Sequence, residues 1–478
     1  MTAPLETGMV GANASPAAAT PAGNSWFVSA TVMLNFETLS LCWSLNAGSG
    51  VLRTLEQPVE TMNAQPSVFS PRRCPMSKAR PINCIIPPYI LDKLLDSEDG
   101  EVRQAALDTL LVTARLRGER GVRASFAGAA APGNGRRTVF DCEQEEFLGN
   151  AVLARPEDGP ESADPSVNLA FDALGLTRDF YNEVFRRNSI DGRGMRLDGY
   201  VHFGFQVNNA FWDGRQMLFG DGDGKEFSNL TGSLEVISHE LTHGVTDHTS
   251  EFEYHNQSGA LNESMSDVFG SLVKQWSLKQ TAEEADWLIG ADVWTPGIRG
   301  DALRSMKDPG HAYNNPKFGK DPQPDRMSRF IHLPDTKRGD FGGVHFNSGI
   351  PNKAFFLTAV RIGGFAWEAA GTIWYESLKA SSAEDEFQVF AGTTFQKAGE
   401  LFGAGSPEQS AVLSAWQEVE VPIAGVPTGV ARVRSLAVNG NGGASREDGQ
   451  AALARQIGAL NDKLTGLAKD VSALKGTM

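Results

Sequence analysis

The stretch His239-Glu240-Leu241-Thr242-His243, followed later by Glu263, decides the fold of this chain. On a helix, residues four positions apart share one face, so His239 and His243 can direct their imidazoles at a single metal ion. Glu240 lies between them in the sequence, near the ion but free of it. Imidazole and carboxylate ligands suit zinc, and a catalytic zinc site uses three protein ligands and leaves a fourth position to water. The spacing therefore predicts a zinc site in which Glu263 is the third ligand.

A lone HExxH pattern also occurs in helices whose histidines are merely solvated or packed. The neighbouring sequence therefore has to distinguish a metal site from such a coincidence. Thr231-Gly232-Ser233 offers a helix start just before an apolar helix entry. Residues 259–269 read as a second helix, on which Glu263 and Asp267 share one face. One carboxylate can then bind the metal while the other accepts a ring N–H of a ligand histidine and fixes its tautomer. This context favours metal binding over coincidence.

Several further motifs resemble those of the thermolysin-like zinc metallopeptidases, and within them the protealysin-like group. The similarity runs from about Cys84 to about Val421. It implies an α+β fold with two lobes, in which a β-rich N-terminal lobe and an α-helical C-terminal lobe flank a zinc cleft. It also implies that Asn262 and Asp267 are partners of the ligand histidines. The motifs are Asn209-Ala210-Phe211-Trp212, residues 220–224, residues 259–267, Leu303-Arg304-Ser305-Met306 and residues 342–349.

The chemistry of peptide hydrolysis gives Glu240 a role of its own. Zinc lowers the pKa of bound water to about 7, and a nearby carboxylate can take its proton and pass it to the leaving amine. Glu240 fits this role of general base. The resemblance adds Tyr254 and His345, whose side chains can stabilise a tetrahedral intermediate. It also adds Asp340, which orients His345 through a hydrogen bond.

The resemblance further implies how substrate is held. Asn209 and Ala210 match the edge that pairs with an extended substrate backbone, and Arg304 matches the residue that binds a substrate carbonyl. An apolar pocket for the residue after the scissile bond would favour cleavage before bulky apolar residues. The positions that match this pocket are Phe227, Leu230, Val236 and Leu303.

The implied function is a zinc-dependent neutral endopeptidase that is made as a self-inhibited precursor and acts on proteins or peptides. Two alternatives stay open. One is a zinc exopeptidase of the same class, which needs a site for a substrate terminus. The other is a non-catalytic binding or adhesion protein assembled through a C-terminal helix.

An inhibitory segment is predicted ahead of the catalytic region. Ile85 to Leu91 reads as an extended apolar stretch, because proline forces its predecessor away from helix. Its Pro-Pro-aromatic-aliphatic motif resembles the short propeptide that covers the cleft in protealysin-like precursors. Such a segment can lie in a substrate groove as a strand without offering a well-placed scissile bond. A proline-rich spacer is the alternative.

The heptad spacing of apolar residues from Leu453 to Leu474 predicts a C-terminal helix. Self-association through residues 453–474 and a lone amphipathic helix are the two interpretations of that pattern. The expected organisation is a disordered extension at 1–73, a propeptide at 74–125, a β-rich lobe with the HExxH helix at 126–254, a helical lobe at 255–424, a flexible linker at 425–450 and the heptad helix at 451–478.

Composition excludes some classes of function. The formal net charge of −15 argues against a nucleic-acid binder, because phosphate neutralisation needs clustered cations. No apolar run reaches the roughly 18 residues of a membrane span, so no membrane anchoring is expected. The four cysteines are predicted to be free thiols, since they form no disulfide framework. Family habit implies secretion, whereas no basic residue precedes Arg53 to mark a signal peptide, which leaves a cytoplasmic pool as the alternative.

One departure from the family concerns metals. One Zn²⁺ is the expected cofactor, but thermolysin-type enzymes also build a double calcium site beside the zinc helix. A lysine and two apolar residues cannot serve as ligands of a hard cation. We therefore predict that the calcium pair is absent, with Lys274 pairing Glu235 or Asp286. The matching positions hold Glu235, Lys274, Asp286, Leu288 and Ala291.

Overall fold

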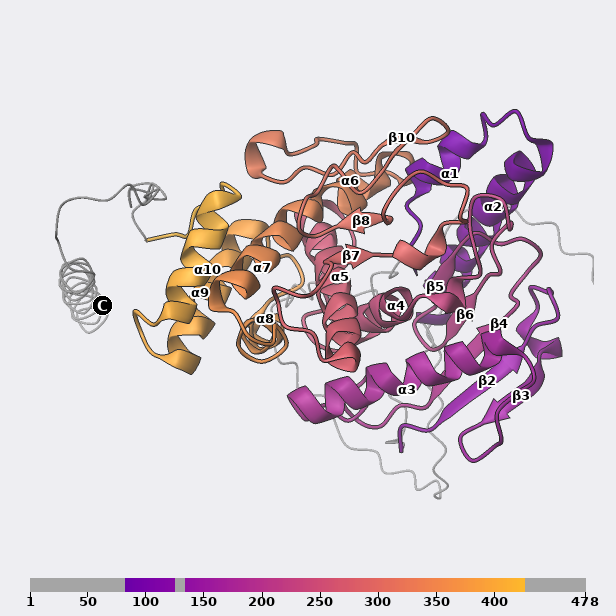
Figure 1. Ribbon diagram of the computed structural model, residues 1–478, viewed down its shortest axis with the longest axis horizontal. Coiled ribbons are helices and arrows are strands. Elements are labelled where there is room, and N and C mark those ends of the chain that lie inside the picture. The colour runs from indigo at the N-terminus through magenta and orange to yellow at the C-terminus, as the bar shows by residue number, and fades with distance from the viewer. Residues whose placement is uncertain (1–81, 125–133, 426–478) are drawn as a thin grey trace, which may run out of the picture. The chain divides into compact units, whose positions relative to one another are not determined.

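Residues 82–124 and 134–425 are the part of the chain that the computed structural model describes (Figure 1). The extension predicted at 1–73 and the heptad helix predicted at 451–478 lie outside them, as does the linker from residue 426 onward. Within the described residues, no helix is long and apolar enough to cross a membrane. Cys84 and Cys142 are buried free thiols, as predicted.

A six-stranded mixed sheet forms the β-rich part, with strand order β1-β5-β6-β4-β2-β3. The neighbouring strands β2, β4 and β6 are parallel, whereas β1, β3 and β5 run antiparallel to their partners. The short strands β5 and β6 are buried at every residue, so their aromatic and apolar side chains fill the core. The strands are β1 (Asn83–Cys84), β2 (Arg137–Asp141), β3 (Val152–Pro156), β4 (Leu197–Val201), β5 (Ala210–Trp212) and β6 (Met217–Phe219).

Two details of the sheet depend on the backbone and on long-range pairing. Strand β4 ends at Val201, because His202 and Gly204 have positive φ angles of 51° and 69° that turn the chain out of the sheet. Strand β5 has only three residues and is held by long-range pairing with β1 and β6.

Three helices pack on the sheet and on one another: α3 (Pro165–Phe185), α4 (Leu234–Asp247) and α5 (Asn256–Leu278). Asp164 caps α3 by accepting the backbone N–H of Ser166. Every residue of α4 from Glu235 to Thr246 is buried, because the helix lies inside the protein rather than on its surface. Figure 1 shows α4 and α5 at the centre, between the sheet and helices α7–α10.

The C-terminal part is helical, which confirms the α+β fold with a β-rich N-terminal and an α-helical C-terminal lobe. Short strands pair within this half as β7 with β8 and β9 with β10. These elements are β7 (Leu288–Ile289), β8 (Arg304–Ser305), β9 (Asn314–Asn315), β10 (Gly319–Lys320), α6 (Asp340–Asn347), α7 (Gly349–Ile362), α8 (Ala369–Ala380), α9 (Phe387–Phe402) and α10 (Pro407–Glu418). Single 3-10 turns are η1 (Leu148–Asn150), η2 (Leu230–Gly232), η3 (Ala291–Val293), η4 (Met327–Arg329) and η5 (Lys337–Gly339).

The segment ahead of the catalytic part forms two helices after β1, namely α1 (Pro88–Leu94) and α2 (Gly100–Ala124). The expectation that Ile85 to Leu91 is extended throughout is therefore wrong beyond Pro87. Pro88 forces Pro87 into an extended conformation with ψ of 142°, yet Pro88 itself opens a helix, where its missing N–H costs nothing.

Candidate active site

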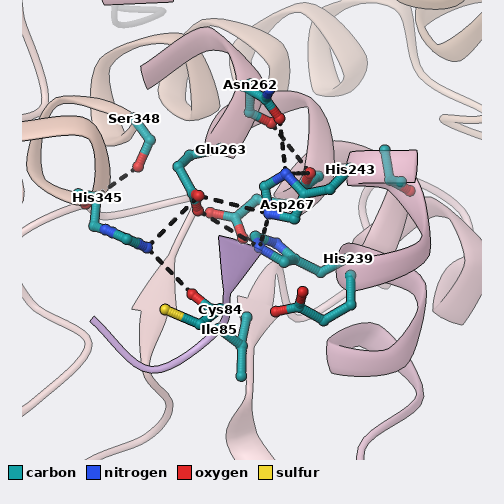
Figure 2. Close-up of polar contacts among 12 residues, drawn as sticks. Cys84, Ile85, His239, His243, Asn262, Glu263, Asp267, His345 and Ser348 are labelled. Atoms are coloured by element: carbon teal, nitrogen blue, oxygen red, sulfur yellow. Dashed lines mark hydrogen bonds and ion pairs between the residues drawn. The ribbon is translucent and has the colours of Figure 1, made fainter. Parts of the chain in front are cut away.

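His239, His243 and Glu263 converge on one buried point (Figure 2). The two histidines lie one turn apart on α4, and their Nε2 atoms are 3.0 Å apart. Glu263 on α5 brings one carboxylate oxygen to 3.5 Å of the Nε2 of His239 and the other to 3.5 Å of the Nε2 of His243. The predicted ligand set is thus gathered by two adjacent helices.

The outer nitrogens of both rings are tied to hydrogen-bond acceptors. The Nδ1 atom of His239 lies 2.8 Å from Asp267 Oδ1, and that of His243 lies 2.7 Å from Asn262 Oδ1. The amide nitrogen of Asn262 donates to the carbonyl of Phe252, so its oxygen faces the ring. Both Nδ1 atoms therefore donate, and when the two rings are neutral each Nε2 presents a lone pair to the other. Two lone pairs this close repel unless a cation lies between them, which is either a proton on one ring or a metal ion, so these residues fit a metal ion.

The charges of the protein itself favour an added positive charge at this point. Burial would lower the pKa of His239, but hydrogen bonds with Asp267 and Glu263 raise it to about 9. Burial lowers the pKa of the neighbouring His243 to about 3. Burial also opposes ionisation of Glu263, yet the charge of His345, together with the hydrogen bond and charge of His239, holds its pKa well below the usual range. An ionised carboxylate therefore faces two rings, of which His243 stays neutral.

Glu240 points its carboxyl group into the same cavity without joining the three ligands. Its Oε2 accepts the backbone N–H of Trp212 at 3.0 Å. Its Oε1 has no hydrogen-bond partner in the described part of the chain, although the side chain is fully buried. Burial raises the pKa of Glu240 to about 8. A carboxyl group with one free oxygen and a pKa near neutrality can both accept and release a proton near neutral pH.

His345 faces Glu263 from the opposite side and is fixed by Asp340. Its Nε2 lies 3.3 Å from the hydroxyl of Tyr254, which itself donates to Glu263. Its Nδ1 lies 2.6 Å from Asp340 Oδ1, and its backbone N–H donates to Asp340 Oδ2 at 2.8 Å. The turn between Asp340 and His345 requires glycine at position 342. The φ angle of Gly342 is 86°, and a Cβ there would lie 2.2 Å from a side-chain oxygen of Asn256. His345, Tyr254 and Asp340, which the resemblance implies for this site, therefore lie close together.

A segment of the chain itself crosses this site. The carbonyl oxygen of Cys84 lies 3.2 Å from the Nε2 of His345. Arg304 donates to the carbonyl of Ile85 at 3.0 Å. Asn209 accepts the N–H of Ile86 at 3.0 Å and donates to its carbonyl at 3.3 Å. Figure 2 shows that the carbonyl of Cys84, rather than its sulfur, is directed at His345.

The residues predicted to line an apolar pocket belong to the same hydrophobic core as this segment. Their side chains are fully buried, and they belong to one hydrophobic cluster with Ile85 and Ile86. Ala210 belongs to strand β5, which lies between β1 and β6. The pocket residues in that cluster are Phe227, Leu230, Val236 and Leu303.

The sequence did not single out all the residues that support this site. Asp267 accepts two hydrogen bonds of 2.8 Å from Arg304, in addition to the one from His239. Asn352 on α7 also donates to it at 2.8 Å. Arg120 on α2 forms an ion pair with Asp247 at the end of α4. No local pattern marks Asn352 or Arg120, because each reaches the site only through the tertiary fold.

Comparison with known proteins agrees with this geometry. The model of the thermolysin metallopeptidase catalytic domain matches residues 160–247, and that of the α-helical domain matches residues 250–421. An extracellular metalloprotease of Pectobacterium carotovorum subsp. carotovorum is 44% identical over 348 residues, which cover 72% of this chain and 98% of that protein. Protease PrtS of Photorhabdus sp. (strain Az29) is 43% identical, with 71% of this chain and 92% of that protein covered.

A solved structure is similar as well. The precursor of protealysin, a metalloproteinase from Serratia proteamaculans, has 44% identity and a TM-score of 0.64, and the match covers 71% of this chain and all of that one. Fold, site and relatives together define a zinc-dependent metalloendopeptidase. The chain belongs to the thermolysin-like metallopeptidase family.

Proposed function

We propose that this chain is a zinc-dependent neutral endopeptidase made as a self-inhibited precursor. His239, His243 and Glu263 would hold the metal, and Glu240 would act as the general base. The observation that carries the proposal is the convergence of two Nε2 lone pairs and one carboxylate on a buried point beside the carbonyl of Cys84.

Each side chain at the site has a separate role in the proposed hydrolysis. Bound Zn²⁺ would supply Lewis acidity and lower the pKa of water to about 7. The free Oε1 of Glu240 accepts the proton of the attacking water and passes it to the amide nitrogen. His345, held by Asp340, donates from Nε2 to the carbonyl oxygen as charge develops there, and the Tyr254 hydroxyl lies beside it.

Substrate binding follows from the contacts made to residues 84–86. Arg304 and Asn209 hold backbone groups, so they position any extended peptide regardless of its side chains. The side chain after the scissile bond enters the apolar cluster that Ile85 occupies. We therefore propose a preference for bulky apolar residues at that position, since their burial contributes about 25 cal/mol per Å². Comparing peptides with Leu and Asp there tests it, and equal rates would refute it.

An endopeptidase is favoured over an exopeptidase by the path of the chain. The segment enters along β5 at Asn83, passes the site at Cys84 and leaves through Ile86 and Pro87. A groove that accepts chain on both sides of the reacting carbonyl does not select a substrate terminus. The non-catalytic alternative is disfavoured, because each proposed catalytic position carries a chemically competent side chain.

The first test is metal dependence. We expect the active enzyme to hydrolyse a quenched peptide with both ends blocked, and 1,10-phenanthroline to abolish this activity. Added Zn²⁺ should restore the rate, whereas added Ca²⁺ should not, because Ca²⁺ prefers several oxygen ligands. Zinc content is measured in parallel by mass spectrometry of the metal. A metal-free sample that still cuts the peptide would refute the proposal.

We propose that residues 74–125 are the inhibitory propeptide, of which the structure describes residues 82–124. Lys225 forms exposed ion pairs with Asp99 and Glu101 of this segment at 2.7 and 2.6 Å. The Arg120–Asp247 pair is buried instead, and Arg120 also donates to the carbonyl of Trp212 at 3.2 Å. Removing one partner of a buried ion pair is strongly destabilising, because the other charge is left buried without a counter-charge. An exposed ion pair contributes only about 0–1 kcal/mol to stability. Arg120 is therefore the main polar anchor of the segment.

Replacing this anchor should weaken inhibition. Loss of one partner from a buried ion pair costs about 3–5 kcal/mol, and about 1.4 kcal/mol already changes an equilibrium tenfold. We expect the freshly purified Arg120→Ala precursor to cut a small reporter peptide at least about tenfold faster than the wild type. The matched control is Arg103→Ala, an exposed arginine on the same helix. Equal basal rates in the Arg120 and Arg103 variants would contradict the assignment.

We also propose that the double calcium site is absent. The Nζ atom of Lys274 lies 3.3 Å from Glu235 and 3.1 Å from Asp286, so a side-chain cation neutralises both carboxylates. The unfolding temperature, measured by calorimetry, should be the same with and without millimolar Ca²⁺. A rise of several degrees on adding Ca²⁺ would overturn this proposal, because a ligand that binds only the folded state stabilises it.

Export of the enzyme is proposed from its relatives, two of which are named as extracellular metalloproteases. Immunoblots of culture medium and of cell lysate test this, and enzyme confined to the lysate would contradict it.

A further inference from the structure

We propose that the peptide bond between Cys84 and Ile85 is a self-cleavage site of the precursor. The inference rests on the proposed function and deepens it, because it identifies a substrate of the site within the same chain. It also differs from the sequence-based expectation that the inhibitory segment lies in the groove without a well-placed scissile bond.

The segment binds with the polarity and register of a substrate. β1 pairs antiparallel with β5, so that Asn83 lies opposite Trp212 and Cys84 opposite Phe211. This pairing leads the chain directly past the proposed metal ligands. The Cys84 carbonyl then lies 3.2 Å from His345 Nε2, the atom that would donate to a developing oxyanion.

The two residues after this carbonyl are held on both backbone and side chain. Arg304 binds the carbonyl of Ile85, and Asn209 binds both the N–H and the carbonyl of Ile86. The side chains of Ile85 and Ile86 are fully buried in the apolar cluster. The bond between Cys84 and Ile85 is therefore the one that these contacts present for attack.

Glu240 has a free carboxyl oxygen in the same cavity for the required proton transfer. The oxygen of a water molecule bonds to the carbonyl carbon of Cys84, and Glu240 takes one water proton. The bond from that carbon to the nitrogen of Ile85 then breaks, and the nitrogen receives the proton from Glu240. The remaining water proton passes from the new carboxyl group to the new amine. One water is consumed, and the products are a Cys84 carboxylate and an Ile85 ammonium group.

The reaction is expected to be slow, because both products remain bound. Asn83 is paired with β5 on one side, while α2 is anchored through Arg120 and Asp247 on the other. The new amine therefore stays beside the new carboxyl group and can reform the bond. However, Cys84 and Ile85 are 1% and 0% exposed, and two buried charged ends are unfavourable there. The cut therefore loosens β1 and begins the release of the segment.

The test follows the full-length chain over time by intact mass and by N-terminal sequencing. Wild-type precursor should accumulate a product that begins at Ile85, at a rate independent of protein concentration, because the cut occurs within one chain. Glu240→Ala precursor should stay intact at this bond. Ile85→Asp should slow the cut at least about tenfold, since a carboxylate enters the apolar cluster. Leu107→Ala, at an exposed position of α2, is the matched control and should be cut like the wild type.

A reporter peptide added to the same samples tests the self-cleavage site and the proposed endopeptidase function separately. If the chain hydrolyses the reporter but never yields an Ile85 terminus, the self-cleavage site is refuted and the proposed function stands. If it cuts neither the reporter nor itself with zinc present, both are refuted. An Ile85 terminus that also forms in the Glu240→Ala precursor would show another protease at work and would overturn the self-cleavage assignment.

Discussion

Glu240→Ala should give an enzyme that is folded and loaded with zinc but turns over about 100 to 10,000 times more slowly, the range that general acid–base catalysis contributes. The substitution removes none of the three proposed ligands, which come from His239, His243 and Glu263. It removes the Oε1 oxygen of Glu240, which has no hydrogen-bond partner among the described residues, and with it the proton acceptor. Rate and zinc content are measured on the same purified variant.

Glu240→Gln distinguishes proton transfer from a merely structural role. The amide oxygen of glutamine can still accept the N–H of Trp212, the contact that Glu240 makes at 3.0 Å. It cannot take up a proton at neutral pH. If the carboxylate serves only to hold strand β5, the Gln variant should recover most of the activity that Ala loses. Near-normal turnover in either zinc-loaded variant would eliminate the proposed mechanism.

The parts of the site that were predictable from sequence lie on long helices. The spacing of His239 and His243, and of Glu263 and Asp267, places each pair on one helical face, and a helix fixes such neighbours locally. The structure brings these four side chains together as expected. His345 and Arg304 came from the resemblance, because no spacing rule connects them to the zinc helix.

The short strands were beyond local prediction. β5 has three residues, and the hydrogen bond from Ile86 to Asn209 spans 123 positions of sequence. Such a strand exists because it is paired on both sides, rather than because its own residues favour it. Asn352 reaches Asp267 across 85 positions, again without a local signal. Prediction therefore failed where contacts are non-local.

Asp267→Ala should weaken metal binding and the fold together. Asp267 orients His239 at 2.8 Å, and loss of such a partner typically costs about 10 to 100-fold in metal affinity or activity. It also forms a bidentate pair with Arg304, and both side chains are buried. Although burial opposes its ionisation, Arg304 and His239 hold the pKa of Asp267 at about 2, so it is a carboxylate near neutral pH. Removing it therefore leaves Arg304 without that counter-charge, at a cost of about 3–5 kcal/mol in the free energy of unfolding.

Asp267→Asn separates the two effects, because it keeps an oxygen that can accept from His239 while it loses the negative charge facing Arg304. We expect the Asn variant to retain more zinc than the Ala variant, yet to share most of its loss of stability. Asn352→Ala serves as the matched control, since it removes only one neutral donor to the same carboxylate, with an expected cost of about 1 kcal/mol. Zinc affinity is measured by competition with a chelator, and stability by denaturant unfolding of the zinc-loaded and metal-free proteins. If Asp267→Ala bound zinc as tightly as the wild type, Asp267 would have no part in orienting His239, and the ligand geometry would have to be fixed by packing of the two helices alone.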